Sequence, residues 1–399
     1  MERPISNKNP PLKRYELLDA FRGVAILTIV CFHLLPSVPE YYGFIKNTII
    51  LYGVNGLPVF FVISGYGIAA SISNLAYYHQ PHMFLLRRLK RIFFCYWWSL
   101  LITALLIPFL QAVALSFKTH AFTLFSPYSF MEWIQVITLT KIFSATSWTL
   151  NTTFDPLNGP LWFLAITVQI YIYVSICLYS RKYFPSLMFS TFIASLLTYV
   201  APIKDILPYG LFLPYFAQVY VGFAVYSLLR RGFAPEKKLI TYLCSFSLLA
   251  FYCFCAFQRN EFFTLSLALI SGYGLLVMHK YHLEIERFSV VRLLSIMGVF
   301  SYSLYLLHFP LRILPGMFAK TLIPFLGDQT QPLVVIAIVI VLSFIWYLFF
   351  EKPSSQIHVL KCLASPIGTI TSGVNLARRA VFRERGFFKK QVGIPFSAE

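Results

Sequence analysis

Long uninterrupted apolar runs constrain the fold of this chain more than any other feature of its sequence. Residues 332–350, for example, hold only apolar and aromatic side chains apart from Pro332 and Ser343. About 18 to 25 such residues in helical form cross a hydrocarbon core of roughly 30 Å. With 58% hydrophobic and 12% charged residues, the chain lacks the polar surface that a soluble globule needs. Strands of a membrane barrel would instead alternate apolar and polar residues over about ten positions. The sequence therefore predicts an all-α, polytopic integral membrane protein.

The apolar runs and the basic residues between them predict ten transmembrane helices with both termini in the cytoplasm. The predicted spans are residues 15–36, 48–70, 92–116, 161–180, 186–202, 209–229, 239–257, 262–279, 294–313 and 332–350. Of the 33 Lys and Arg residues, 25 fall in one alternate set of connections and tails, seven fall in the other set, and Arg22 lies inside the first span. Because cytoplasmic loops carry the excess of Lys and Arg, this asymmetry fixes the orientation. It also accounts for the net charge of +18 without a nucleic-acid partner.

The segments outside the spans predict one membrane domain and one tail. Residues 1–355 are expected to form the membrane domain, and residues 356–399 a basic cytoplasmic tail. The longest extracytoplasmic connection, residues 117–160, contains an amphipathic stretch at residues 131–143, which predicts a cap over that face. No cleavage site of small residues follows the first apolar run, so we expect that run to stay in the membrane. The seven cysteines lack metal-ligand spacing, and no metal site is predicted.

Ionisable residues inside spans are few, and each is costly there unless it has a polar partner or a watery cavity. Arg22 and His33 lie eleven residues apart in the first span. At about 100° and 1.5 Å per residue they share one helix face and stand roughly 16 Å apart along the axis. His308, in the ninth span, should reach a depth similar to that of His33, so two imidazoles at one depth predict a site. The simpler alternative is that Arg22 reaches lipid headgroups, held by Asp19 three residues earlier, and that His33 is an interfacial residue.

A basic cluster stands directly before the third predicted span. It consists of Arg87, Arg88, Lys90 and Arg91. Such a cluster commonly anchors a helix to lipid headgroups. Arginine also makes planar bidentate contacts with phosphate, so several arginines facing Arg22 would suit a donor with more than one phosphate. The sequence contains no GxxxxGK[ST] and no strand-borne GxGxxG, which argues against ATP hydrolysis and against a dinucleotide fold.

Six motifs, taken together and in order, resemble the integral-membrane acyltransferase-3 family over about residues 13–353. They are RYELLDAFRGVAILTIVCFH at 14–33, GLPVFFVISGYGI at 56–68, RRLKRIF at 87–93, GPLWFLAITVQIYI at 159–172, SYSLYLLHFPL at 301–311, and EKP at 351–353. Members of this family acylate extracytoplasmic carbohydrates with cytoplasmic acyl-CoA. The chain departs from the family pattern at one place. Members often carry a glutamate pair after the LW motif, where Thr167 and Val168 stand here, so the resemblance implies no carboxylate role at these positions.

The resemblance implies roles for individual residues. His33 would act as the general base that takes the proton of the acceptor hydroxyl, or would carry the acyl group itself. The implied donor-binding residues are Arg22, Arg87, Arg88 and Arg91. The candidate lining residues are Asp19, Ser64, Trp162, Tyr302, Tyr305 and His308. The tyrosines also fit ordinary membrane-interface residues. The donor would be acyl-CoA, in the simplest case acetyl-CoA, and no bound cofactor is expected.

The expected function is the transfer of an acyl group to a hydroxyl of a cell-surface or lipid-linked glycan, in a bacterial inner or plasma membrane. The partners would be acyl-CoA, the glycan acceptor and membrane lipids. We recognise no fused esterase-like domain, so any further extracytoplasmic transfer step would need a separate protein. A transporter or flippase for a polar or glycan-linked substrate could line its path with the same Arg and His residues, although no half-sequence repeat is visible. A purely structural scaffold would not need Arg22, His33 and His308 inside its spans.

Overall fold

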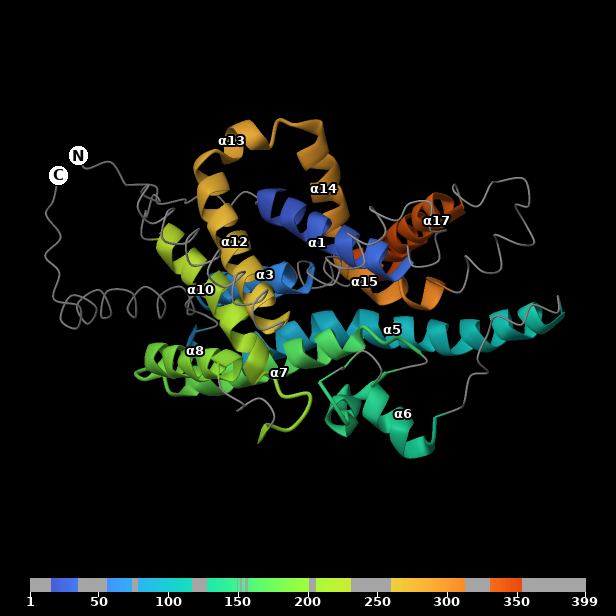
Figure 1. Ribbon diagram of the computed structural model, residues 1–399, viewed down its shortest axis with the longest axis horizontal. Coiled ribbons are helices and arrows are strands. Elements are labelled where there is room, and N and C mark those ends of the chain that lie inside the picture. The colour runs from blue at the N-terminus through green and yellow to red at the C-terminus, as the bar shows by residue number, and fades with distance from the viewer. Residues whose placement is uncertain are drawn as a thin grey trace, which may run out of the picture. The chain divides into compact units, whose positions relative to one another are not determined.

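The described part of the chain is helical. The computed structural model describes residues 16–34, 56–73, 78–116, 128–148, 150, 153–154, 157–200, 206–230, 260–312 and 331–353. Within these residues it contains no strand (Figure 1), which confirms the all-α prediction for them. The chain divides into one compact unit, Met1–Glu351, and a second unit, Lys352–Glu399. The predicted span at 239–257 and the predicted tail at 356–399 lie outside the described residues.

The helices of the membrane unit have the following bounds. The α-helices are α1 (Glu16–Leu34), α3 (Gly56–Ile72), α5 (Pro81–Ser116), α6 (Phe130–Ile137), α7 (Leu161–Tyr179), α8 (Phe184–Val200), α10 (Phe216–Arg230), α12 (Asn260–Lys280), α13 (His282–Ile285), α14 (Ser289–Val299), α15 (Ser301–Leu307) and α17 (Gln331–Trp346). The shorter segments are the 3₁₀ turns η3 (Thr140–Ser144), η5 (Leu213–Tyr215) and η6 (Pro310–Arg312), and a π-helical turn, η7 (Tyr347–Glu351).

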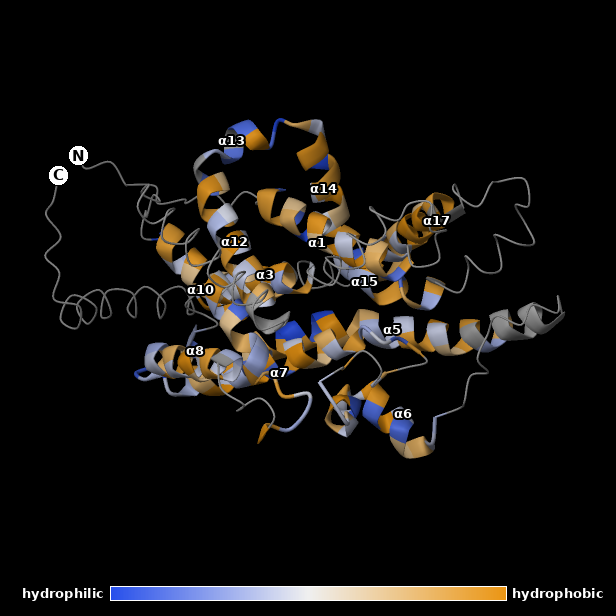
Figure 2. Cartoon of the chain, viewed as in Figure 1, coloured by the Kyte–Doolittle hydropathy of each residue, from blue (hydrophilic) through white to orange (hydrophobic). Residues whose placement is uncertain are grey.

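Four described segments are long and apolar enough to cross a membrane. They are Glu16–Leu34, Pro81–Leu106, Leu161–Tyr179 and Leu333–Glu351. Helices α14 and α15 form a fifth if the 60° bend between them is allowed within one span, and α3, α8 and α12 are apolar but shorter. The hydropathy colours show α17 as almost wholly apolar (Figure 2). The described residues thus show a helical membrane protein with four or five candidate spans, and they do not confirm the predicted number of ten.

Helix α5 begins at Pro81, before the predicted start of the third span at residue 92, so the basic cluster lies within the helix. The candidate span of this helix falls within Pro81–Leu106, and the point at which the helix enters the membrane stays a prediction. Proline suits the first position of a helix, and arginine and lysine are good helix formers, so nothing stops the helix on either side of the cluster. The Ser175 hydroxyl of α7 donates to the Pro81 carbonyl at 3.1 Å, which places the start of α5 beside the last turns of α7. The cluster therefore runs alongside α7.

Two glycines bring α1 and α14 into backbone contact. A Cβ atom added to Gly23 of α1 would lie 2.0 Å from the Leu294 carbonyl oxygen of α14. A Cβ added to Gly298 of α14 would lie 1.7 Å from the Asp19 carbonyl oxygen of α1. Small residues at such crossings are typical of membrane helix packing. Because of this contact, the turn of α1 that carries Asp19 and Arg22 packs directly on the end of α14.

Helices α3 and α10 pack in the same reciprocal way. A Cβ on Gly65 of α3 would meet the Val219 carbonyl oxygen at 1.8 Å, and a Cβ on Gly222 of α10 would meet the Val62 carbonyl oxygen at 1.7 Å. Helix α3 also packs against α1 and α12. Its position between these helices directs Ser64 towards α1 and α5, where the site lies.

The most buried of the candidate spans is α7, with 72% of its residues inside the protein, whereas the span of α17 has only 22%. Helix α7 packs against α5 and α8. Large apolar side chains of α5 are exposed, among them Trp97, Leu101 and Leu105. These side chains suit contact with lipid tails. The site therefore lies between α7, which is mostly inside the protein, and α5, which has one face exposed.

The predicted amphipathic stretch at 131–143 corresponds to α6 and η3. Ser129 caps α6, and its hydroxyl and backbone N–H both bond to Glu132 in a capping box. The Lys141 ammonium donates to the Glu132 carboxylate at 2.8 Å. The bonds from Lys141 and Ser129 together hold the pKa of Glu132 down at about 2. Tyr96 of α5 donates to the Val136 carbonyl at 2.6 Å, which fastens α6 to α5.

Candidate functional site

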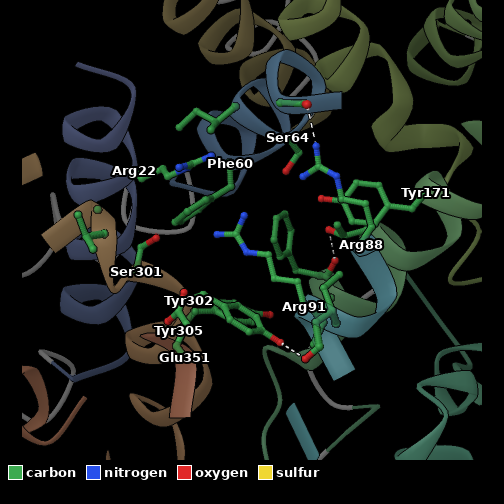
Figure 3. A pocket seen from close by; sticks show the side chains of 18 residues that line it. Arg22, Phe60, Ser64, Arg88, Arg91, Tyr171, Ser301, Tyr302, Tyr305 and Glu351 are labelled. Carbon is green, nitrogen blue, oxygen red and sulfur yellow. Dashed lines mark hydrogen bonds between the residues drawn. The ribbon is translucent and has the colours of Figure 1, made fainter. Parts of the chain in front are cut away.

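A cavity of about 140 Å³ lies inside the membrane unit, among α1, α3, α5, α7, the α14–α15 bend and η7 (Figure 3). Its polar lining residues are Arg22, Ser64, Arg88, Arg91, Thr167, Tyr171, Ser301, Tyr302, Tyr305 and Glu351. On the same measure of volume, one water molecule needs about 10–15 Å³, so this cavity could hold several waters or part of a polar ligand. The cavity therefore provides the polar surroundings that make arginines tolerable inside a membrane protein.

Arg22 enters the cavity from α1. Its Nη1 donates to the Asp19 carboxylate at 2.9 Å, and the Asp19 side chain is only 7% exposed. The three-residue separation puts both side chains on one face of the helix. Asp19 is thus in contact with Arg22, nearly four helical turns from His33. A buried carboxylate at this distance restricts the guanidinium to the cavity wall.

Arg88 enters from α5 and bridges to α3. Its Nη2 donates to the Gly67 carbonyl at 2.7 Å and to the Ser71 hydroxyl at 2.5 Å. The guanidinium carbon also lies 5.7 Å from the centre of the Phe84 ring and 5.3 Å from that of Tyr171. Both hydrogens of Nη2 are therefore used within the protein, and Nη1 and Nε remain as the donors that a ligand could meet. Arg88 contributes to helix packing as well as to the cavity.

Arg91 reaches into the cavity from the same helix, and Arg87 does not. In Figure 3 the guanidinium of Arg91 extends towards Arg22, with Phe60 beside them. Arg87 is exposed and is not a lining residue. The structure therefore brings together Arg22, Arg88 and Arg91 and leaves Arg87 outside the cavity.

Glu351 supplies a carboxylate that the sequence analysis did not assign to the site. It is 6% exposed, lines the cavity and ends the π-helical turn η7. Its Oε2 accepts from the Ser303 hydroxyl at 2.6 Å and from the Ser303 backbone N–H at 3.2 Å. The carboxylate thereby caps the first turn of α15, directly after the 60° bend. Its sequence signal was its position as the first ionisable residue after the uncharged run at 332–350.

Two tyrosines of α15 form the wall opposite α3. The Tyr302 hydroxyl donates to the Ile92 carbonyl of α5 at 2.7 Å. The Tyr305 hydroxyl donates to the Pro160 carbonyl, in the turn before α7. Both rings line the cavity, as does Ser64 of α3. Hydrogen bonds to neighbouring elements therefore fix the orientation of both phenol rings.

The two histidines lie together behind this wall. The rings of His33 and His308 are 5.2 Å apart between centroids, and His33 also meets the Phe309 ring edge-on at 5.3 Å. His308 is completely buried, and its Nδ1 lies 2.7 Å from the Tyr305 carbonyl oxygen. Because a carbonyl oxygen only accepts, Nδ1 must carry the hydrogen, and in a neutral imidazole Nε2 then holds the lone pair. Neither histidine is a lining residue of the cavity.

The remaining sequence-predicted positions divide between the cavity and the packed core. Trp162 packs on Phe163 and Tyr215 and is not a lining residue. Thr167 lines the cavity and donates its hydroxyl to the Phe163 carbonyl at 2.9 Å, whereas Val168 is buried in the hydrophobic core. One of the two positions at which the family often carries glutamate thus faces the same cavity as Glu351.

Comparison with known proteins assigns the chain to a family. The family model described as an acyltransferase domain, that of the acyltransferase-3 family, matches residues 15–351. The matched range contains every lining residue of the cavity and both histidines. Comparisons with curated proteins and with solved structures give no match. The chain therefore belongs to the acyltransferase-3 family and is a membrane acyltransferase.

Proposed function

We propose that the protein transfers a short acyl group, acetyl in the simplest case, from acyl-CoA to a hydroxyl of an extracytoplasmic carbohydrate. The observation that carries the proposal is that an arginine-lined cavity adjoins a histidine pair. Arg22, Arg88 and Arg91 line the cavity, and Tyr302 and Tyr305 of α15 form part of its wall. The Tyr305 ring lies 5.9 Å from that of His308, which lies 5.2 Å from that of His33. Such an arrangement separates the binding of an anionic donor from the acyl-transfer step.

The arginines support a donor with phosphate groups. Guanidinium–phosphate contacts are charge-assisted and stronger than neutral hydrogen bonds. At about 140 Å³ the cavity is smaller than the roughly 300–1,000 Å³ of a typical ligand pocket, so it could enclose only part of CoA. A second, open cleft of about 520 Å³ shares Val299 with the cavity wall, and its charged lining residues are Arg287, Arg292, Glu16 and Glu286. Because two carboxylates offset the two guanidinium groups, this cleft has no excess of positive charge for phosphate groups.

The proposed chemistry allows two roles for His33. As a general base, its imidazole takes the proton of the acceptor hydroxyl while the oxygen attacks the thioester carbonyl. The carbon–sulfur bond then breaks, and the CoA thiolate leaves and is protonated. As a nucleophile, the imidazole attacks the carbonyl first, the carbon–sulfur bond breaks, and CoA leaves as the thiol with the proton of the imidazole. The acceptor oxygen then attacks the acyl carbon, the bond from that carbon to the imidazole nitrogen breaks, and the hydroxyl proton passes to the freed imidazole. His308, with the lone pair on Nε2, would orient or relay a proton for His33 in either case.

The proposed function is tested by mass spectrometry of cell-envelope glycans from cells with and without the protein. We expect one acyl group, an increase of 42 Da for acetyl, on glycans of the cells that contain it. Identical glycan masses in both samples, with the protein present in the membrane, would overturn the proposal.

Arg91→Ala should weaken CoA binding by about 10- to 100-fold, since a hydrogen bond to a charged group contributes about 1.5–3 kcal/mol. Arg87→Ala is the matched control, because Arg87 belongs to the same basic cluster but is exposed outside the cavity. Its effect should stay within about threefold, as expected for a surface position. Titration of the purified variants with CoA measures both values. If the two variants lose the same amount of CoA affinity, the basic cluster is better explained as an anchor to lipid headgroups.

We also propose that the protein crosses a bacterial plasma membrane ten times, with both termini in the cytoplasm. The 25-to-seven distribution of Lys and Arg supports this topology, and the basic tail would then lie beside the acyl-CoA pool. A reporter fused after Glu399 is expected to be cytoplasmic, and one inserted within residues 144–158 is expected to be extracytoplasmic. A cytoplasmic result at 144–158 would exclude this topology.

A further inference from the structure

We infer that Tyr305, held by the turn before α7, is a partition that separates the donor cavity from the histidine pair and controls what the thioester can react with. The inference rests on the proposed function. It assigns Tyr305 a positioning and specificity role.

The Tyr305 ring has the donor cavity on one side and a histidine on the other. It lines the cavity together with Arg22 and Arg91. Its centroid lies 5.9 Å from that of His308 and 5.8 Å from that of Phe163. His308 is completely buried and does not line the cavity. The ring and its neighbour Phe163 therefore occupy the boundary between the arginine-lined space and the imidazoles.

The turn before α7 holds this boundary at two adjacent places on α15. The Tyr305 hydroxyl donates to the Pro160 carbonyl. The Asn158 side-chain amide donates to the Leu306 carbonyl at 2.9 Å, and Asn158 is 4% exposed. The Asn158 carbonyl in turn accepts from the Leu161 N–H, the first residue of α7, at 3.1 Å. The turn thus ties the histidine-bearing end of α15 to the beginning of α7.

This arrangement has a chemical consequence for the proposed reaction. Reacting atoms must come within roughly 3–3.5 Å of each other. Tyr305 lines the cavity and His33 does not, and the Tyr305 ring lies 5.9 Å from that of His308, so a thioester held in the cavity reaches the imidazoles only after the Tyr305 ring has moved. While the partition is closed, the thioester is kept from the imidazoles that would activate an attacking water. The partition would also favour acyl groups small enough to pass beside a displaced phenol ring.

The test measures release of CoA thiol from acetyl-CoA by the purified full chain without any acceptor. Water then attacks the thioester carbonyl, the carbon–sulfur bond breaks, and acetate and CoA thiol are formed. We expect Tyr305→Ala to raise this release by about tenfold or more over wild type, because water and thioester then meet the imidazoles in one space. The rise should disappear in the Tyr305→Ala/His33→Ala double variant. The release of CoA thiol by Tyr305→Ala should rise by a larger factor with butyryl-CoA than with acetyl-CoA.

Tyr305→Phe keeps the ring and removes only its bond to Pro160, so it should raise release by a smaller factor, about two- to fivefold. Tyr96→Phe is the matched control. The buried Tyr96 hydroxyl also donates to a carbonyl, that of Val136, but Tyr96 does not line the cavity, and release should stay at the wild-type rate. If Tyr305→Ala does not yield folded protein, the thiol release by Tyr305→Phe alone tests the inference.

Two outcomes would overturn the inference. If Tyr305 variants bind CoA like wild type and release thiol at the wild-type rate, Tyr305 is not a partition, and the proposed function is unaffected. Wild-type protein that binds neither CoA nor acetyl-CoA would overturn the proposed function itself, and this inference with it.

Discussion

His33→Ala is expected to lower the rate of acyl transfer by about 10²- to 10⁴-fold if His33 is a general base, and by more if it forms the acyl intermediate. Binding of CoA should change little, because His33 lies behind the Tyr305 wall and does not line the arginine cavity. The rate is measured as the extent of glycan acylation in cells, and binding as a CoA titration of the purified variant.

Arg22→Ala on the same helix provides the contrast. Arg22 lines the cavity and contacts Asp19, so its loss should weaken donor binding, and transfer should partly recover at high donor concentration. Loss of His33 should not be rescued by more donor. Wild-type acylation by His33→Ala would show that His33 is not the reaction centre, and a transporter or flippase would become the better explanation of the Arg and His residues within the helices.

Gly298→Ala should be strongly destabilising, with an expected loss of about 3 kcal/mol or more. The added Cβ would lie 1.7 Å from the Asp19 backbone oxygen, so α1 and α14 must move apart. Overpacking of a tight contact costs about 1–3 kcal/mol, and backbone that cannot yield raises this figure. Thermal unfolding in detergent, followed by loss of the monodisperse peak, measures the effect.

Gly67→Ala is the control for this change. A Cβ at Gly67 would lie 3.7 Å from Arg88 Nη2, which is ordinary van der Waals contact. Replacing a helical glycine by alanine otherwise stabilises by about 0.5–1 kcal/mol, so Gly67→Ala should unfold at or above the wild-type temperature. Equal unfolding temperatures for the Gly298 and Gly67 variants would show that the α1–α14 contact is not as close as described.

Part of the fold and of the site follows from the sequence because it depends on counting along single helices. The apolar runs predicted α1 and α7 to within a few residues, at Glu16–Leu34 and Leu161–Tyr179. The three-residue step between Asp19 and Arg22 predicted their pairing. Depth counting from the ends of two separate spans predicted that His33 and His308 would approach each other, and their rings are 5.2 Å apart.

Other features depend on contacts between helices, which a single sequence does not reveal. The extension of α5 back to Pro81 was not predicted, because a hydropathy pattern discounts charged residues, whereas a polar cavity accommodates them within a helix. Helical geometry puts Arg87 and Arg88 equally close to the face of Arg91. The contacts of Arg88 with Gly67 and Ser71 of α3 distinguish the two, and these contacts join residues 21 and 17 positions apart on different helices.

Glu351 was missed for a related reason. A carboxylate next to a lipid-facing span fits an interfacial residue as well as a buried one, and its partner Ser303 lies 48 residues away. Thr167 shows the opposite case, since the resemblance drew attention to its position and the structure places it in the cavity wall. The cavity of this chain thus has the carboxylate of Glu351 from η7 and the hydroxyl of Thr167 from α7.

The Glu351 cap has a consequence for the biogenesis of the protein. Synthesis completes α15 before the ribosome reaches Glu351, because that residue follows Ser303 by 48 positions. Until the final apolar helix has entered the bilayer, the first turn of α15 lacks its carboxylate, and the segment that carries Tyr305 and His308 has no anchor on that side. Nascent chains would therefore remain inactive through most of translation. A product terminated just before Glu351 would retain the arginines and both histidines but would lack the cap on the first turn of α15.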